Sequence, residues 1–214
     1  DFLNFVRYAH KSGIDAVLIQ DLGMYDLIHQ KFPNLEIHAS TQLHIHNLDG
    51  ALVAKKLGFK RIVLARETDI DTIKEIKEKT SLDIEVFVHG SLCVSYSGQC
   101  LFSSLVGGRS GNRGACAGSC RLPYDIVDKN NIVLNKTKKY PLSMKDLCAI
   151  SSIGKLMDIG VNSFKIEGRM KSKEYVYLVT KLYRKAIDSY LEKQEVTIDY
   201  EILDKLKKVF NREY

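Results

Sequence analysis

Short apolar runs alternate with helical stretches along this chain, and only a few folds accept that alternation. The runs are rich in β-branched residues, most of them end in polar residues, and they cover 15–21, 35–40, 61–67, 83–90 and 161–168. The stretches between them repeat apolar residues at helical spacing, as Phe2, Phe5 and Val6 do ahead of Gly13. Nearly continuous apolar strands separated by helices are typical of a parallel sheet with helices outside it. The sequence therefore predicts an α/β fold.

Two parallel architectures fit this pattern, a (βα) TIM barrel and an open doubly wound sheet. No GxGxxG follows a strand, so nothing supports a dinucleotide-binding sheet. Polar clusters at successive strand ends favour the barrel, because its active site collects at the carboxyl ends of the strands. The clear strands and a weak one at 140–144 are fewer than a barrel needs, and the chain starts with Asp1 rather than Met. We therefore expect residues 1–214 to form a single TIM-barrel-like domain that is incomplete at its N-terminus.

Residues 91–139 interrupt the alternation and form one long loop insertion. The insertion is rich in cysteine, glycine and arginine, and "KNN" between "YDIV" and "IVLN" predicts a hairpin turn inside it. Two helices are expected after it, one over 145–160 and a longer one that Ser172 caps. Loops as long as this insertion are usually functional or disordered inside compact domains. We therefore expect the insertion to carry part of the function.

The cysteines allow several kinds of site, and they are Cys93, Cys100, Cys116, Cys120 and Cys148. No secretory leader precedes them and their number is odd, so reduced thiols are favoured over disulfides. Only Cys116 and Cys120 approach the spacing of a zinc knuckle. A nucleophilic Cys93 with His89 as its base leaves the other thiols unexplained, and glycine-rich segments are poor places to bury cysteines as small hydrophobes. Thiolates around an iron–sulfur cluster, with one cysteine spare, explain more of the pattern.

Polar residues at the strand ends are candidates for chemistry, because such residues face the substrate in a barrel. They include Arg66, Glu67, His89, Glu167 and Arg169, with Ser40, Thr41 and Gln42 at the same mouth. His89 is either a general acid or base, or a hydrogen-bonded turn residue. Guanidinium groups bind carboxylates and phosphates, so the basic residues of the insertion fit a dicarboxylate or an RNA backbone, unless they only keep the loop soluble.

Six sequence blocks carry a family resemblance. They are "HASTQLHIHN", "EVFVHGSLCVSYSGQCLFSS", "GRSGNRGACAGSCRLPY", "PLSMKDLCAI", "SFKIEGRMKSKEYV" and "FNREY", and they are distributed from residue 38 to the end of the chain. In this order they resemble peptidase family U32, the collagenase-like protease family. The resemblance implies a (βα)-barrel catalytic domain. Some members are named for collagen or gelatin degradation, and others are 4Fe–4S proteins of tRNA uridine hydroxylation, ribosomal RNA cytidine hydroxylation or ubiquinone synthesis.

The resemblance also implies a set of cluster ligands, whereas the expected catalytic and substrate-binding roles follow from the strand-end positions and basic residues described above. The expected cluster ligands are Cys93, Cys100, Cys116 and Cys148, with Cys120 as an alternative to Cys116. Cys148 lies at the start of a predicted helix, where the helix dipole favours a thiolate. The expected catalytic residues are His89, Glu67, Glu167 and Arg169. The expected substrate-binding residues are Gln42, Arg66, Arg109, Arg113, Arg121 and Lys145.

The sequence predicts an iron–sulfur enzyme that hydroxylates RNA, specifically a tRNA uridine, with prephenate or another anionic small molecule as oxygen donor. A net charge of +6 agrees with an anionic partner. A U32 collagenase-like peptidase is the second hypothesis, although the chain has no HExxH, GxSxG or recognisable aspartate pair. An accessory protein with a structural cluster is the third. No run approaches the ~18 apolar residues of a membrane span, so we expect a cytoplasmic protein without a membrane partner.

Overall fold

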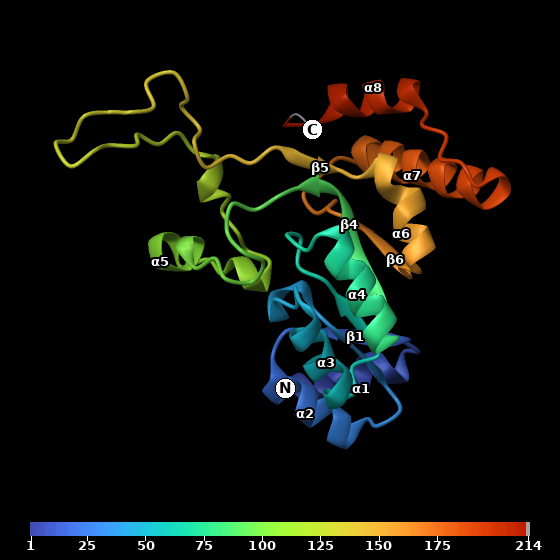
Figure 1. Ribbon diagram of the computed structural model, residues 1–214. Coiled ribbons are helices and arrows are strands. Elements are labelled where there is room, and N and C mark those ends of the chain that lie inside the picture. The colour runs from blue at the N-terminus through green and yellow to red at the C-terminus, as the bar shows by residue number, and fades with distance from the viewer. Residues whose placement is uncertain (213–214) are drawn as a thin grey trace.

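The computed structural model describes residues 1–212, which form one six-stranded sheet with helices packed on it (Figure 1). The strands are β1 (Ala16–Ile19), β2 (Glu36–Ala39), β3 (Arg61–Val63), β4 (Asp83–Ser91), β5 (Asp146–Cys148) and β6 (Ser163–Ile166). β1, β2, β3, β4 and β6 are parallel and neighbour one another in that order, whereas β5 pairs antiparallel with the end of β4. Glu213 and Tyr214, which end the "FNREY" block, lie outside the described residues.

The longer helices precede, connect and follow the strands. They are α1 (Phe2–Lys11), α2 (Leu22–Lys31), α3 (Leu48–Leu57), α4 (Ile70–Thr80), α6 (Ile153–Ile159), α7 (Lys173–Lys193) and α8 (Tyr200–Val209). α3 packs on α4, α4 on α6, α6 on α7, and α7 on α8. The strand order never reverses, as it would in a doubly wound sheet. No helix in the described part of the chain is long and apolar enough to cross a membrane.

Alternation along the strands separates a buried face of the sheet from a polar one. In β4, Ile84, Val86 and Val88 are at most 4% exposed and belong to the hydrophobic core. Glu85 and Phe87 lie between them in sequence and are partly exposed. This period of two places the helices on one face only. The structure therefore confirms the α/β class with a parallel sheet. β1 and β6 each have one neighbour in residues 1–212, and a closed barrel stays a prediction.

The segment before α6 differs from the sequence-based expectation. The strand predicted at 140–144 is wrong, because these residues form turns and coil, and β5 follows them instead. The helix expected over 145–160 begins only at Ile153, since Asp146 and its neighbours pair with the end of β4. The buried Asp146 accepts hydrogen bonds from the main chain and guanidinium of Arg212, at 3.0 and 3.2 Å. A long-range ion pair thus overrides the local helical pattern.

Residues 92–145 link β4 to β5, and we call them the β4–β5 insertion; they overlap the predicted 91–139. The insertion contains α5 (Phe102–Gly107) and a hairpin over residues 124–139. Val127 pairs with Val133 across the predicted turn, where Asn131 has a φ of +60°. The hairpin extends away from the sheet and the helices (yellow-green in Figure 1). Among the described residues, the hydrophobic core takes no side chain from this insertion.

Candidate functional site

A pocket of about 590 Å³ lies at the carboxyl ends of the parallel strands, over the polar face of the sheet. Leu18 of β1, Phe87 of β4 and Ile166 of β6 supply its apolar lining. Its amide and charged lining residues are Gln20, Gln42, Arg66, Asn112, Arg113, Lys165, Glu167 and Arg169. Among the lining residues Glu167 is the only anion, so cations dominate the pocket. The pocket therefore suits an anionic ligand.

Arg66 connects three parts of the pocket. Its Nη2 atom donates to Oε2 of Glu167 at 3.2 Å, and its guanidinium lies 4.0 Å from the centre of the Phe87 ring. Its Nε atom is buried and has no hydrogen-bond partner in residues 1–212. Buried donors are normally paired, so an unpaired Nε in a cationic pocket is a position where a ligand oxygen would be stabilised.

Two glycines let the insertion form one wall of this pocket. Gly98 has a φ of +79°, and a Cβ there would lie 2.6 Å from the carbonyl oxygen of Gln42. Gly114 has a φ of +78°, and a Cβ there would collide with the guanidinium of Arg169. Asn112 donates from Nδ2 to the Gly98 carbonyl at 2.7 Å. Positions 98 and 114 favour glycine because φ is positive there and because a Cβ atom would lie too close to Gln42 or Arg169.

Glu67 lies beside the pocket and ties the insertion to the sheet. Ser97 donates its main-chain N–H to Oε1 and its hydroxyl to Oε2 of Glu67, each at 2.9 Å. His44 Nε2 lies 3.1 Å from the same Oε1. Burial acts to raise the pKa of Glu67, but the Ser97 hydrogen bonds and His44 outweigh it and hold the pKa below its ordinary value. Glu67 is therefore an ionised anchor, next to a second hollow of about 280 Å³ that includes Cys93 and Ser97.

The residues predicted to bind substrate separate into two groups. Those that line the large pocket are Gln42, Arg66 and Arg113. Those that lie elsewhere in the described structure are Arg109, Arg121 and Lys145. Arg109 donates to the carbonyl of Ala115 at 3.0 Å, and Lys145 is exposed. Of the predicted catalytic residues, Glu167 and Arg169 line the pocket.

Arg121 joins the two ends of the insertion instead of facing the pocket. Its Nη2 atom donates to the carbonyl of Leu92, where the insertion begins. Its Nη1 atom donates to the carbonyl of Met144 at 2.5 Å and to the hydroxyl of Ser143 at 2.9 Å, where the insertion ends. Arg121 is therefore a structural clasp, and its guanidinium is occupied by these three partners.

Four of the five cysteines lie near one another in the insertion. Burial raises the pKa of Cys120, the positive charge of Arg121 acts to lower it, and the thiolates of Cys93, Cys116 and Cys100 act to raise it. Cys93 and Cys116 are exposed, and Cys100 and Cys120 are half-buried. Within residues 1–212, no three His, Cys, Asp or Glu side chains are close enough together to hold a metal ion. The thiols are thus neighbours but do not form a closed site.

Cys148 is the one cysteine outside the insertion. It ends β5, pairs with His89 in the register of the sheet and packs against the hydrophobic core. Burial raises its pKa. A 3₁₀ turn over Ile150–Ser152 follows Cys148 and leads into α6, and a hydrogen bond from the Ile150 N–H acts to lower the pKa of Cys148, as expected for a helix start, although burial outweighs it. The structure brings Cys120 into the neighbourhood of Cys93.

His89 does not reach the mouth of the sheet, contrary to the sequence-based expectation. The register with β6 shifts between Phe87 and His89, and this irregularity turns the imidazole towards the helices. The side chain is 1% exposed, and its Nδ1 atom lies 3.3 Å from the hydroxyl of Tyr183 on α7. Burial lowers the pKa of His89 to about 4. His89 is thus a neutral core residue and lines neither pocket.

Comparison with known proteins assigns the sequence to a family. The family model described as "Peptidase family U32" matches residues 1–214. This chain belongs to peptidase family U32. A solved structure of a U32 peptidase matches 72% of this chain and 55% of its own chain, at 13% identity and a TM-score of 0.39.

Three curated relatives carry different names. The "23S rRNA 5-hydroxycytidine C2501 synthase" of Escherichia coli is 44% identical over 86% of this U32 chain and 28% of its own length. The "tRNA hydroxylation protein P1" of Bacillus subtilis is 39% identical over 100% of this chain and 51% of its own. The "Collagenase" of Porphyromonas gingivalis is 37% identical over 95% of this chain and 52% of its own. The chain spans between 28% and 52% of these relatives.

Several site residues of this U32 chain lie outside the set that the sequence predicted. Lys165 lines the pocket and donates to Glu85 at 2.9 Å across the polar face of the sheet. The alternation in "SFKI" is a signal for this position, because Lys165 is the polar residue between two apolar ones. Asn112 and Ser97 carry no such signal, since loop contacts alone place them.

Proposed function

We propose that this U32 chain is part of an enzyme that hydroxylates a nucleobase of RNA, with tRNA uridine as the first candidate. Relatives named for rRNA 5-hydroxycytidine synthesis and tRNA hydroxylation support this function. The observation that carries it is the juxtaposition of a cationic pocket with a thiol-rich insertion, since Asn112 and Arg113 of that insertion line the pocket. An anionic ligand and a redox group would therefore lie close to each other.

The pocket would hold an anionic oxygen donor, and a dicarboxylate such as prephenate fits it. Arg113 and Arg169 present guanidinium forks at the rim, and such forks bind carboxylates in a bidentate manner. The unpaired Nε of Arg66 supplies a further donor. We expect Arg169→Gln to weaken binding of prephenate by tenfold or more in titration calorimetry, and Arg109→Gln, outside the pocket, to leave it unchanged.

The insertion supplies four cysteine thiols, the type of ligand that holds iron–sulfur clusters, and we propose that they close around a 4Fe–4S cluster when it binds. The residues that would hold it are Cys93, Cys100, Cys116 and Cys120. When bound, the cluster would supply electron-transfer chemistry. Arg121 and Glu67 would keep the loop around it in place. Cys148, which the sequence predicts as a ligand in place of Cys120, is partly buried against the core and forms the alternative to Cys120 in this proposal.

Glu167 is the residue that we assign to proton transfer. Replacing a ring C–H bond by C–OH requires that a proton leave the ring carbon. Glu167 is the only carboxylate among the pocket-lining residues, and its ion pair with Arg66 fixes its orientation. Arg66 therefore acts as a positioning residue, and we expect Glu167→Gln to abolish hydroxylation while the protein still folds.

We further infer that β1, β2, β3, β4 and β6 are successive strands of a TIM barrel. The unreversed strand order and the successive packing of α3, α4, α6 and α7 support this architecture. A cytoplasmic location agrees with an RNA substrate, and it is part of the same proposal.

Deleting the gene and measuring modified nucleosides tests the function directly. Nucleoside mass spectrometry of tRNA and rRNA from the deletion strain should lose 5-hydroxyuridine or 5-hydroxycytidine, and the wild-type gene should restore it. The Glu167→Gln variant should fail to restore it, whereas Lys55→Gln, an exposed change on α3, should succeed. Unchanged hydroxynucleosides in the deletion strain would refute the proposal.

The cluster ligands are tested by a matched pair of variants. After purification without oxygen, Cys120→Ala should lose iron and the absorbance near 400 nm, whereas Cys148→Ala should retain both. If instead Cys148→Ala loses iron and Cys120→Ala keeps it, the ligand set predicted from the sequence is right and the one proposed above is wrong.

A peptidase remains the second candidate because a relative at 37% identity is named collagenase. A thiol protease needs a histidine base within reach of its cysteine. His89 is 1% exposed and faces Tyr183, so it does not serve Cys93 in this way. Gelatin cleavage by the purified wild-type protein that survives Cys93→Ala would support a peptidase with a different nucleophile, and absence of cleavage by the wild type would contradict this candidate.

A further inference from the structure

The net positive charge of this protein lies in the β4–β5 insertion. Residues 92–145 contain eight lysines and arginines and two aspartates, which accounts for the whole net charge of +6. The rest of the chain balances twenty-four basic residues against twenty-four acidic ones. A neutral body with one strongly basic segment has a single preferred place for a polyanion.

The hairpin within the insertion presents lysines that no acidic side chain neutralises. Lys129, Lys136, Lys138 and Lys139 are exposed, and none of them forms an ion pair within residues 1–212. Elsewhere, lysines such as Lys79 and Lys185 lie 2.6 and 2.7 Å from a carboxylate oxygen. The hairpin therefore keeps its cationic groups available for a ligand from outside the chain.

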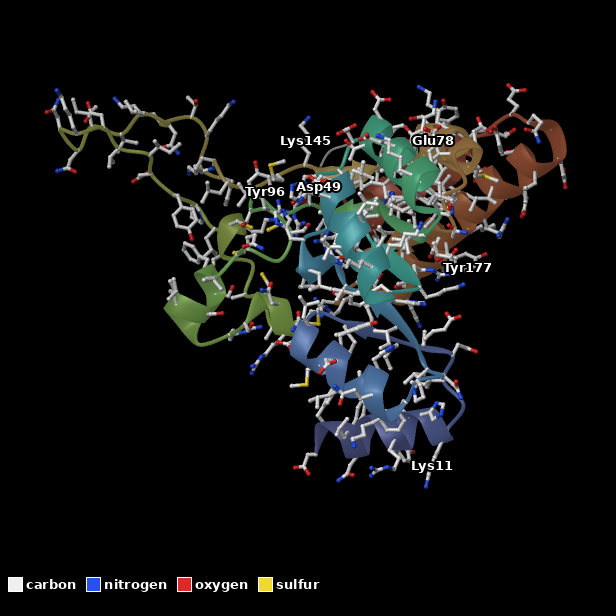
Figure 2. All side chains as sticks on the ribbon, turned by 60° about the horizontal axis from the view of Figure 1, so that its bottom comes forward. Lys11, Asp49, Glu78, Tyr96, Lys145 and Tyr177 are labelled. Atoms are coloured by element: carbon white, nitrogen blue, oxygen red, sulfur yellow. The ribbon has the colours of Figure 1, made fainter. Side chains whose placement is uncertain are left out.

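The shape of the hairpin fits a large ligand better than a small one. It stands away from the sheet and helices, and its side chains project into solvent (Figure 2). Ile132 and Leu134 are 54% and 63% exposed, and Tyr140 beside the hairpin is 56% exposed. Lysines interleaved with exposed apolar and aromatic side chains match a strand of RNA, in which phosphates alternate with flat base surfaces.

We infer that the hairpin over residues 124–139 is the arm by which this protein docks its RNA. This inference rests on the proposed function, in which RNA is the substrate. The lysines contact phosphates, and the apolar side chains contact unpaired bases. The same insertion forms a wall of the cationic pocket through Asn112 and Arg113, so it joins the docking arm to the reaction site.

Neutralising the arm tests the inference. In the full-length protein, Lys129, Lys136, Lys138 and Lys139 are all replaced by Gln, and binding of fluorescein-labelled bulk tRNA and of protein-free rRNA is followed by anisotropy. The affinity is expected to fall about tenfold or more, and the slope of log K against log salt concentration to fall by about 3. The matched control replaces Lys11, Lys31, Lys55 and Lys56 by Gln, which removes the same charge from exposed positions of α1, α2 and α3.

The labelled Lys11 in Figure 2 lies far from the hairpin, so the control should bind both RNAs as the wild type does. Equal losses in the two variants, or unchanged binding and slope in the hairpin variant, would overturn the inference. Nucleoside mass spectrometry distinguishes failure of this inference from failure of the proposed function. If hydroxynucleosides persist in a strain that carries the hairpin variant, the proposed hydroxylation still stands even where the docking inference fails. If Ile132→Ser with Leu134→Ser changes the sedimentation coefficient while the hairpin variant binds RNA normally, the arm is a protein contact and the inference is wrong.

Discussion

The sheet-and-helix body and the β4–β5 insertion are held together in different ways. The body supplies every residue of the described hydrophobic core, and its acidic and basic residues balance. The insertion supplies none of that core, carries the whole net charge and contains four thiols. Because apolar burial is the main force that stabilises a fold, the insertion depends on polar ties such as Glu67 and Arg121 and on what it binds. The body positions the site, and the insertion completes it.

Truncating one apolar side chain in each region should give the largest difference between the two regions in the free energy of unfolding. Ile62 on β3 is 0% exposed, and Ile62→Ala should lower the free energy of unfolding by about 2–5 kcal/mol. Leu105 on α5 is 82% exposed, and Leu105→Ala should change it by less than about 0.5 kcal/mol. Urea unfolding followed by circular dichroism measures both values. Equal losses would mean that α5 packs against the body in solution, and the comparison between the regions would fail.

Acid should destabilise the body, because the buried His89 on β4 has a lowered pKa. The insertion contains no histidine and should not contribute to this effect. The unfolded chain protonates His89 near pH 6.5, whereas the folded protein keeps it neutral down to about pH 4. The unfolded state thus binds more protons in this window, so stability falls as the pH drops from 6.5 to 4, by about 3 kcal/mol. His89→Leu should flatten this part of the stability profile, and His10→Leu on α1 should not. A profile that His89→Leu leaves unchanged would contradict the burial seen here.

The sequence predicts the structure of the body better than that of the insertion, because the elements of the body follow local patterns. Period-two and helical patterns are local, so the parallel strands, most helices and the Ser172 cap, which accepts from the Tyr175 N–H at 3.2 Å, follow from the residues. β5 is three residues long and is created by pairing with β4 and by the Asp146–Arg212 ion pair, so no local pattern indicates it. The orientation of His89 depends on one irregularity in the register of β6.

The site follows the same division. Glu167 and Arg169 end a strand and line the pocket, as the sequence indicates. The surroundings of Cys120 depend on how the insertion folds back, which motif spacing does not indicate, and the choice between Cys120 and Cys148 as a cluster ligand stays a prediction.

Removing the clasp should loosen the insertion and spare the body. Arg121→Met leaves the carbonyls of Leu92 and Met144 without a donor, which should lower the free energy of local opening by about 1–3 kcal/mol. The thiols of the cluster-free protein should then react faster with Ellman's reagent, while the urea midpoint of the body moves little. Arg109→Met is the control, because the guanidinium of Arg109 donates to the carbonyl of Ala115 and does not join the two ends of the insertion. Similar thiol rates in the two variants would show that Arg121 does not hold the ends together.

The smallest expected effect is at Glu67, where the two regions meet. Hydrogen bonds from Ser97 hold the pKa of Glu67 below its ordinary value of 4.5, so the folded state favours the carboxylate and the tie weakens only as the pH falls through the folded pKa. Glu67→Gln should therefore cost about 1 kcal/mol at pH 7 and nothing at a pH below the folded pKa. The Ser97 amide resonance, followed by NMR, should titrate with a midpoint below 4.5 in the wild type and stay constant in the variant. Glu75→Gln, which removes an exposed pair with Lys79, should leave this resonance and its titration unchanged. A wild-type midpoint at or above 4.5 would mean that Glu67 does not anchor the insertion, and the boundary between the two regions would have to lie elsewhere.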